Sequence, residues 1–96
     1  MKHHTRAHLL ISGRVQGVLF RQSARAKALE LGLTGWAHNL IDGTVEIVCE
    51  GEKESIEKFI EWCKKGSPLA KVEHVDVSLE EYKGEFSSFE IREFGF

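Results

Sequence analysis

A loop with two glycines joins an expected strand at residues 7–12 to a helix that is expected to begin at Phe20. Gly13 and Gly17 permit backbone angles that let successive amide N–H groups converge on one point. That point lies just before the N-terminus of the helix, where unpaired N–H groups and the helix dipole favour an anion. The loop therefore has the chemistry of an anion-binding site.

Arg21 falls in the first turn of the same helix. A cation there opposes the positive end of the helix dipole, unless an anion normally lies between the two. A guanidinium and a ring of amides together would hold a phosphoryl group through several charge-assisted hydrogen bonds. The pattern alone fits a glycine-rich turn with a solvent-facing arginine equally well.

Asn39 is a second polar residue that could belong to a site, because it ends an expected strand at residues 34–39. The pair Asp42-Gly43 follows, and a second expected strand covers residues 44–50. Asp-Gly between extended runs predicts a hairpin, since both turn residues tolerate positive φ. An asparagine before such a turn commonly bonds to its own backbone, so Asn39 alone does not indicate a site.

Two helices are predicted from apolar spacing. The first ends near Gly32, which stands where a C-terminal cap belongs, and its apolar positions are Phe20, Ala24, Ala28 and Leu31. The second covers residues 52–65, with acidic residues early and lysines late as the helix dipole prefers, and its apolar stripe is Ile56, Phe59, Ile60 and Cys63.

Alternating apolar residues predict a half-buried strand at residues 74–80, and a turn is expected at residues 83–85. A short final strand is expected at Phe89 and Ile91, extending towards Phe94. The resulting order, βαββαβ with a short extra strand, predicts a ferredoxin-like α+β sandwich: an antiparallel sheet with two helices on one face.

The 96 residues allow one domain, expected over residues 1–96, with about residues 1–6 as a flexible N-terminal segment. A net charge of −2 argues against a nucleic-acid partner. No apolar run is long enough to span a membrane, and the N-terminus lacks the apolar core of a signal peptide. We therefore expect a cytoplasmic protein.

The two cysteines, Cys49 and Cys63, are too few for a disulfide-stapled secreted fold, and both fall on apolar stripes. We expect buried, inert thiols, and a disulfide between them remains open at this stage. His3, His4 and His8 cluster near the expected flexible N-terminus, so we expect no metal site.

Two long motifs resemble the signatures of the acylphosphatase family. The first runs from Gly13 to Arg21 (GRVQGVLFR), and the second runs from Gly35 (GWAHNLIDGTV) on to Gly51. The similarity extends to residues 66–70 and to the strand that ends near Arg92. This resemblance implies a ferredoxin-like fold, a monomer, and hydrolysis of the carboxyl-phosphate bond of acyl phosphates without a metal or cofactor.

Matched by position, the resemblance implies that Arg21 binds the phosphate and that Asn39 orients the attacking water. It also implies a phosphate cradle formed by the loop amides of Arg14, Val15, Gln16, Gly17, Val18 and Leu19. Two positions depart from the family pattern. Leu19 stands where glycine is frequent, and His38 stands where lysine or arginine is common, which would remove a fixed positive charge beside the site.

The implied chemistry is consistent with the residue types. The leaving group of an acyl phosphate is a carboxylate, with a pKa near that of a glutamate side chain, about 4.3, so no general acid is needed. The protein must neutralise the phosphoryl oxygens and align a water, which suits Arg21 with the amides and Asn39, respectively. A neutral carboxamide both accepts from and donates to water without adding negative charge.

The main alternative is a binding module on the same fold that keeps the phosphate cradle but has lost catalysis. The sequence lacks the motifs of two other phosphatase classes. A cysteine phosphatase needs arginine six residues after its cysteine, but Ser55 stands at that spacing after Cys49. An Asp-x-Asp-Gly-Thr motif needs aspartate at position 40, where the chain has Leu40. An RNA-binding sheet would need exposed aromatic residues on the third strand, and residues 44–50 offer none.

Overall fold

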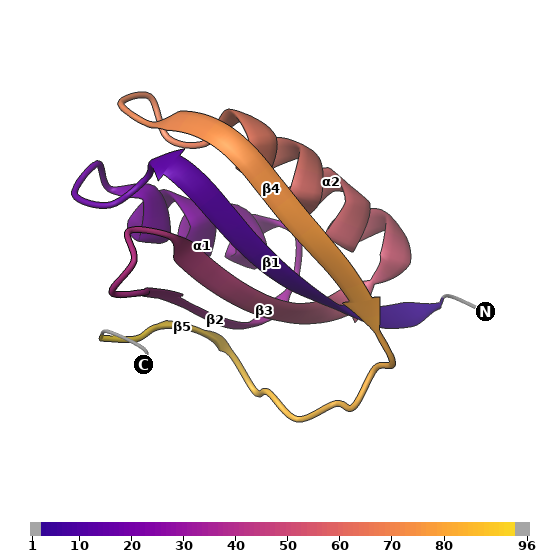
Figure 1. Ribbon diagram of the computed structural model, residues 1–96. Helices are drawn as coiled ribbons and strands as arrows, with labels where there is room; N and C mark the ends of the chain where they lie inside the picture. The colour runs from indigo at the N-terminus through magenta and orange to yellow at the C-terminus, as the bar shows by residue number, and fades with distance from the viewer. Residues whose placement is uncertain (1–2, 94–96) are drawn as a thin grey trace.

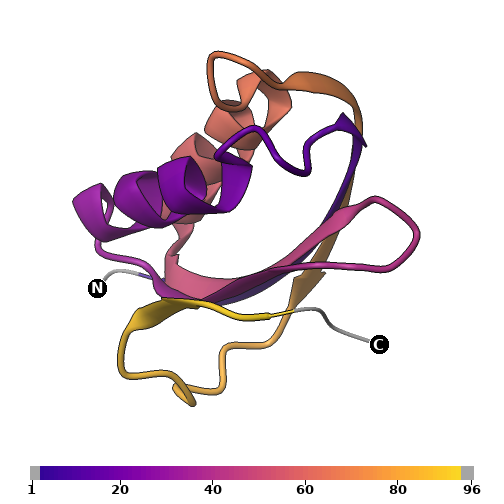
Figure 2. The same ribbon diagram turned by 90° about the vertical axis from the view of Figure 1, so that its left-hand side faces the viewer.

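The computed structural model describes residues 3–93, which form two helices and five strands. Both helices cover one face of the sheet, as Figures 1 and 2 show from two directions. The ferredoxin-like α+β prediction is confirmed. In chain order, the elements are β1 (His4–Arg14), α1 (Phe20–Glu30), β2 (Thr34–Asn39), β3 (Val45–Glu52), α2 (Lys53–Lys65), β4 (Lys71–Glu80) and β5 (Phe89–Ile91).

The strand order across the sheet is β4-β1-β3-β2-β5. The first four strands pair antiparallel, as expected, whereas the short β5 runs parallel to β2. Residues 81–88 connect β4 at one edge of the sheet to β5 at the other edge, and this crossing determines the direction of β5. The sheet is therefore mixed, and the expected extension of the last strand to Phe94 lies outside the described residues.

The core lies between the sheet and the helices. Strand alternation points every second side chain of β1 and β3 towards the helices, and the predicted helical stripes meet them there. Trp62 of α2 packs at its edge, 5.5 Å from the ring of Phe20. The largest fully buried apolar side chains include Phe20, Phe59, Phe89, Leu9, Ile11, Ile47 and Ile56.

Two further strands, β1 and β4, differ from the sequence expectation. β1 begins at His4, because residues 4–6 pair with residues 50–52 of β3, so this part of the expected flexible N-terminus belongs to the sheet. Residues 1–2 lie outside the described residues. β4 is less buried than expected, because it is an edge strand: Val77 is 41% exposed and Leu79 is 60% exposed. Within residues 3–93, no helix is both long and apolar enough to cross a membrane.

Candidate active site

Three segments that are separate in the sequence meet around one small cavity of about 140 Å³. They are the loop between β1 and α1, the first turn of α1, and the end of β2. The cavity brings Arg21 and Asn39 together with part of the loop, whereas the predicted site residues Arg14, Gln16 and Val18 do not line it. Its lining is Val15, Gly17, Leu19, Phe20, Arg21, Gln22 and Asn39.

The loop backbone turns sharply before α1. Gly17 has φ 73°, a left-handed angle that only glycine adopts without strain. Leu19 also adopts a left-handed conformation, with φ 62°, and its carbonyl accepts the first helical hydrogen bond from the amide of Ser23 at 3.0 Å. The Leu19 side chain makes no capping hydrogen bond, and no acidic residue lies in the first turn. The first N–H groups of α1 are therefore available to an anion.

The loop is anchored from two sides. The Gln16 side-chain amide donates to the carbonyl of Leu40 at 2.7 Å and to that of Thr44 at 2.9 Å, which ties the loop to the β2–β3 hairpin. On the other side, the Ser67 hydroxyl donates to the carbonyl of Val18 at 2.9 Å. These bonds hold the loop between the hairpin and residues 66–70, and all three segments gather at one end of the molecule, on the left of Figure 1.

Arg21 is positioned by the C-terminal part of the chain. Its Nη1 donates to the carbonyl of Arg92 at 2.8 Å. Arg92 is itself fixed on the sheet, because its amide donates to the carbonyl of Ala37 and its guanidinium lies 4.9 Å from the ring centre of Trp36. A guanidinium has five N–H donors, so the bond to Arg92 leaves others for a ligand in the cavity. Sequence reasoning missed this contact, which joins residues 71 positions apart.

Asn39 is the last residue of β2 and is only 9% exposed. Among the described residues, its side-chain Oδ1 is buried and has no hydrogen-bond partner. The hairpin turn is closed by another residue, because the Asp42 carboxylate accepts bonds from the amide and hydroxyl of Thr44 at 3.0 and 2.7 Å. Turn formation therefore does not account for Asn39, whereas a ligand in the adjoining cavity would satisfy this oxygen.

The comparison with known proteins agrees with this geometry. The sequence profile of the acylphosphatase family matches residues 7–91. The chain belongs to the acylphosphatase family. It is 54% identical to an acylphosphatase of Pelotomaculum thermopropionicum over 86 residues, which cover 90% of this chain and 94% of that protein.

Solved structures show the same fold. An acylphosphatase from Coxiella burnetii superposes with a TM-score of 0.88 at 45% identity, covering 93% of each chain. The crystal structure of an acylphosphatase from Bacillus subtilis superposes with a TM-score of 0.89 at 35% identity, covering 92% of this chain and 98% of that one. The predicted family membership is confirmed.

His38 lies away from the cavity. Strand alternation places Asn39 on the helix side of β2 and His38 on the open face. There the His38 Nε2 lies 2.6 Å from Glu46 Oε1, and His8 Nε2 lies 2.5 Å from the other carboxylate oxygen. Burial alone would raise the pKa of the Glu46 carboxyl. Its hydrogen bonds to His38 and His8 lower the pKa by more than burial raises it, so the pKa of Glu46 lies below its ordinary value. The departure at position 38 therefore changes the open face and not the lining of the cavity.

Both cysteines are free and buried. Burial raises the pKa of the Cys49 thiol to about 12 and holds the pKa of Cys63 well above its ordinary value. Neither thiol lines the cavity. Within residues 3–93, no group of histidine, cysteine and acidic side chains is arranged to hold a metal ion.

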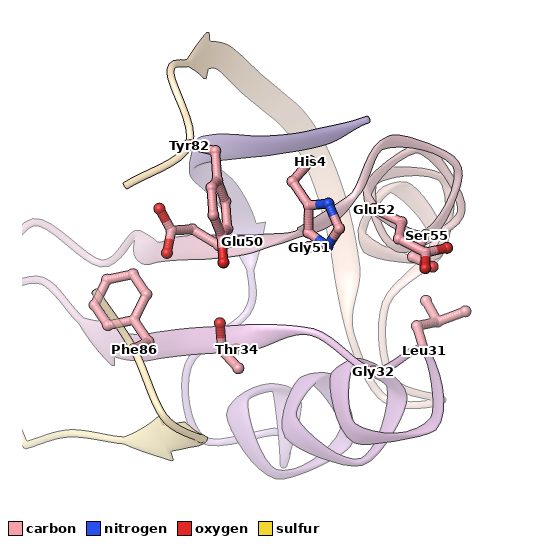
Figure 3. Close-up of a pocket in the computed structure, with 10 residues that line it drawn as sticks. All are labelled: His4, Leu31, Gly32, Thr34, Glu50, Gly51, Glu52, Ser55, Tyr82 and Phe86. Atoms are coloured by element: carbon pink, nitrogen blue, oxygen red, sulfur yellow. The ribbon is translucent and has the colours of Figure 1, made fainter. Parts of the chain in front are cut away.

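A larger pocket of about 270 Å³ lies at the other end of the sheet, beside the first residue of β1 and the end of α1 (Figure 3). Its buried polar group is the Glu50 carboxylate. It accepts bonds from the amides of Lys83 and Glu85, at 2.7 and 3.2 Å, and from Arg6 Nη1 at 3.5 Å. These contacts fasten residues 81–88 to the sheet. The pocket contains none of the predicted site residues.

Proposed function

We propose that the protein hydrolyses the carboxyl-phosphate bond of an acyl phosphate by direct attack of a positioned water. The observation that carries this proposal is the cavity in which the loop between β1 and α1, Arg21 and the buried Asn39 meet. Membership of the acylphosphatase family supports the same reaction.

In this proposal, Arg21 and the amides of the loop between β1 and α1, whose residues Val15, Gly17 and Leu19 line the cavity, bind the phosphoryl oxygens. Charge-assisted hydrogen bonds from a guanidinium and from backbone N–H groups stabilise the negative charge of the phosphoryl group as its bond to the acyl oxygen breaks. The carbonyl of Arg92 holds one N–H of Arg21. This contact orients the guanidinium before the substrate arrives, so less freedom is lost on binding.

Asn39 orients the water. Its unpartnered Oδ1 accepts a hydrogen bond from the water, whose oxygen then attacks phosphorus in line with the leaving oxygen. The new P–O bond forms while the old one breaks, and the electron pair leaves with the carboxylate. The proton released from the water ends on the phosphate product. Since the carboxylate is a good leaving group, no general acid is required.

The buried thiols argue against a cysteine nucleophile in this reaction. Cys49 and Cys63 keep their protons at neutral pH, because burial raises the pKa of each, and a protonated thiol is a poor nucleophile. We further propose that the protein acts without a metal or cofactor, as a monomer in the cytoplasm, on a small diffusible acyl phosphate.

The test is steady-state hydrolysis of benzoyl phosphate by the wild-type protein, with EDTA present throughout. We expect turnover in EDTA and competitive inhibition by inorganic phosphate. Turnover that requires an added divalent metal would contradict the metal-free mechanism. A folded protein that binds phosphate but does not hydrolyse benzoyl phosphate would instead be a phosphate-binding module.

A further inference from the structure

Leu19 combines three properties that are rarely found together in a leucine. It adopts a left-handed conformation, with φ 62°, in which a leucine is strained and a glycine is not. Its side chain is 64% exposed, although it is large and apolar. It also lines the cavity that holds Arg21 and Asn39. An exposed apolar side chain at a strained position beside the cavity that holds Arg21 and Asn39 points to a role for the side chain itself.

The direction of attack indicates what this side chain would touch. Asn39, which is 9% exposed, lies on the inner side of the cavity, whereas Leu19 lies on the solvent side. In-line displacement requires the attacking water and the leaving oxygen to lie on opposite sides of phosphorus. A water held by Asn39 therefore directs the acyl group outwards, to the side of the cavity where Leu19 is exposed.

We propose that the Leu19 side chain contacts the acyl group of the substrate and favours acyl phosphates whose acyl group is apolar and larger than acetyl. This proposal rests on the proposed function and adds the part of the substrate that the phosphate cradle does not contact. Contact with an apolar acyl group would remove apolar surface of both partners from water. A small or charged acyl group would gain little from the same contact.

Leu19→Ala tests the proposal, because it removes the apolar side chain but keeps Cβ and the backbone amide. The readout is kcat/KM for benzoyl phosphate divided by kcat/KM for acetyl phosphate. We expect this ratio to fall about three- to tenfold, at or below the lower end of the roughly 10- to 200-fold range for an apolar contact in a substrate pocket, because Leu19 is largely exposed. The inhibition constant of inorganic phosphate serves as a check that the cradle still binds.

Leu29→Ala is the matched control. Leu29 is also an exposed leucine, at 48%, but it lies in the last turn of α1 and does not line the cavity. We expect its substrate ratio to equal that of the wild type. Leu19→Gly is a second variant that removes the side chain together with the backbone strain, and it should show the same fall in the ratio as Leu19→Ala.

The outcomes separate this proposal from the function on which it rests. If both Leu19 variants hydrolyse the two substrates in the wild-type ratio, or lose both equally, Leu19 supports the loop only and the proposal is overturned. If wild-type protein hydrolyses neither substrate, the proposed function fails first, and the acyl contact fails with it. A selective loss for benzoyl phosphate with unchanged phosphate inhibition supports the contact.

Discussion

Two buried polar side chains at opposite ends of the sheet have contrasting surroundings. Glu50 of β3 is 1% exposed and accepts hydrogen bonds from two backbone amides and Arg6. Asn39 of β2 is 9% exposed, and its Oδ1 has no partner among the described residues. Glu50 lines the larger pocket, and Asn39 lines the smaller one.

This contrast separates a structural role from a functional one. A buried acceptor with several donors contributes to stability, whereas a buried acceptor without one costs about 1–3 kcal/mol. A fold retains such a group where a ligand satisfies it. The comparison predicts that substitutions around Asn39 and Arg21 reduce activity, and that substitutions at Glu50 reduce stability.

The largest expected effect is that of Arg21→Ala, which removes the guanidinium from the cavity. We expect kcat/KM for benzoyl phosphate to fall at least about 10³-fold, a typical loss for an arginine that stabilises a transferring phosphoryl group. Inhibition by inorganic phosphate should weaken in parallel. Arg25→Ala is the matched control, because Arg25 lies on the same helix and also donates to a backbone carbonyl near the C-terminal end of the described chain, that of Phe89 at 3.1 Å. Unlike Arg21, it does not line the cavity. Equal losses in the two variants would contradict a specific role for Arg21.

The converse prediction concerns Glu50→Gln. The substitution leaves a side chain of similar shape but removes the charge that faces Arg6 and two amide donors. Because hydrogen bonds to a charged group contribute about 1.5–3 kcal/mol, we expect the free energy of unfolding in urea to fall by about 2–3 kcal/mol. Turnover per folded molecule should stay within about twofold of wild type. A large loss of turnover without loss of stability would place the Glu50 pocket in the reaction.

The pH dependence of stability sharpens the same prediction. Burial tends to raise the pKa of Glu50, but the amides of Lys83 and Glu85 and the Arg6 guanidinium outweigh it, so the pKa lies below its ordinary value of 4.5. A group with a depressed pKa stabilises the folded state above the unfolded pKa and loses this contribution as pH falls through the folded pKa. Urea titrations from pH 6 to pH 3 should therefore show a shallower loss of stability for Glu50→Gln than for wild type. Parallel curves would show that Glu50 makes no such contribution.

An intermediate effect is expected for Gln16→Ala. Gln16 does not line the cavity, but its side chain ties the loop to the hairpin through the carbonyls of Leu40 and Thr44. Loss of two hydrogen bonds should lower the free energy of unfolding by about 1–2 kcal/mol. A looser cradle should lower kcat/KM about tenfold, since small misplacements of binding groups are costly in the transition state. Unchanged kinetics would mean that the loop keeps its geometry without this tie.

The smallest effect is expected from thiol modification. Cys49, whose pKa is about 12, and Cys63 are both buried, so iodoacetamide should react slowly in native buffer at pH 7.5 and rapidly in urea. Activity should persist during native treatment. Rapid loss of activity in native buffer would indicate a reactive thiol near the cavity.

Sequence patterns predicted most of the fold because its elements depend on local spacing. The helix start at Phe20, the hairpin across Asp42-Gly43 and the stripe on α2 all follow from residues close together in the chain. The parallel direction of β5 and the high exposure of β4 depend on edge positions in the sheet, which spacing does not determine.

For the candidate site, the sequence predicted the residues but not the contacts that position them. The loop, Arg21 and Asn39 were identified by their types and motifs, and the structure places parts of all three around one cavity. The contacts that position them were not predictable, because they join distant residues: Gln16 bonds to residues 24 and 28 positions away, and Arg21 to one 71 positions away. Nor did the alternation of β3 indicate that Glu50, expected on its polar face, would be covered by residues 81–88.

The central claim is that the unpartnered Oδ1 of Asn39 positions the attacking water. The most direct test compares wild type with Asn39→Ala, measuring kcat for benzoyl phosphate and the inhibition constant of inorganic phosphate in EDTA. We expect kcat to fall about 10²- to 10³-fold, as for loss of a single positioned hydrogen-bonding group, while phosphate still binds through Arg21 and the loop amides. Near-normal turnover by the folded variant would contradict the claim.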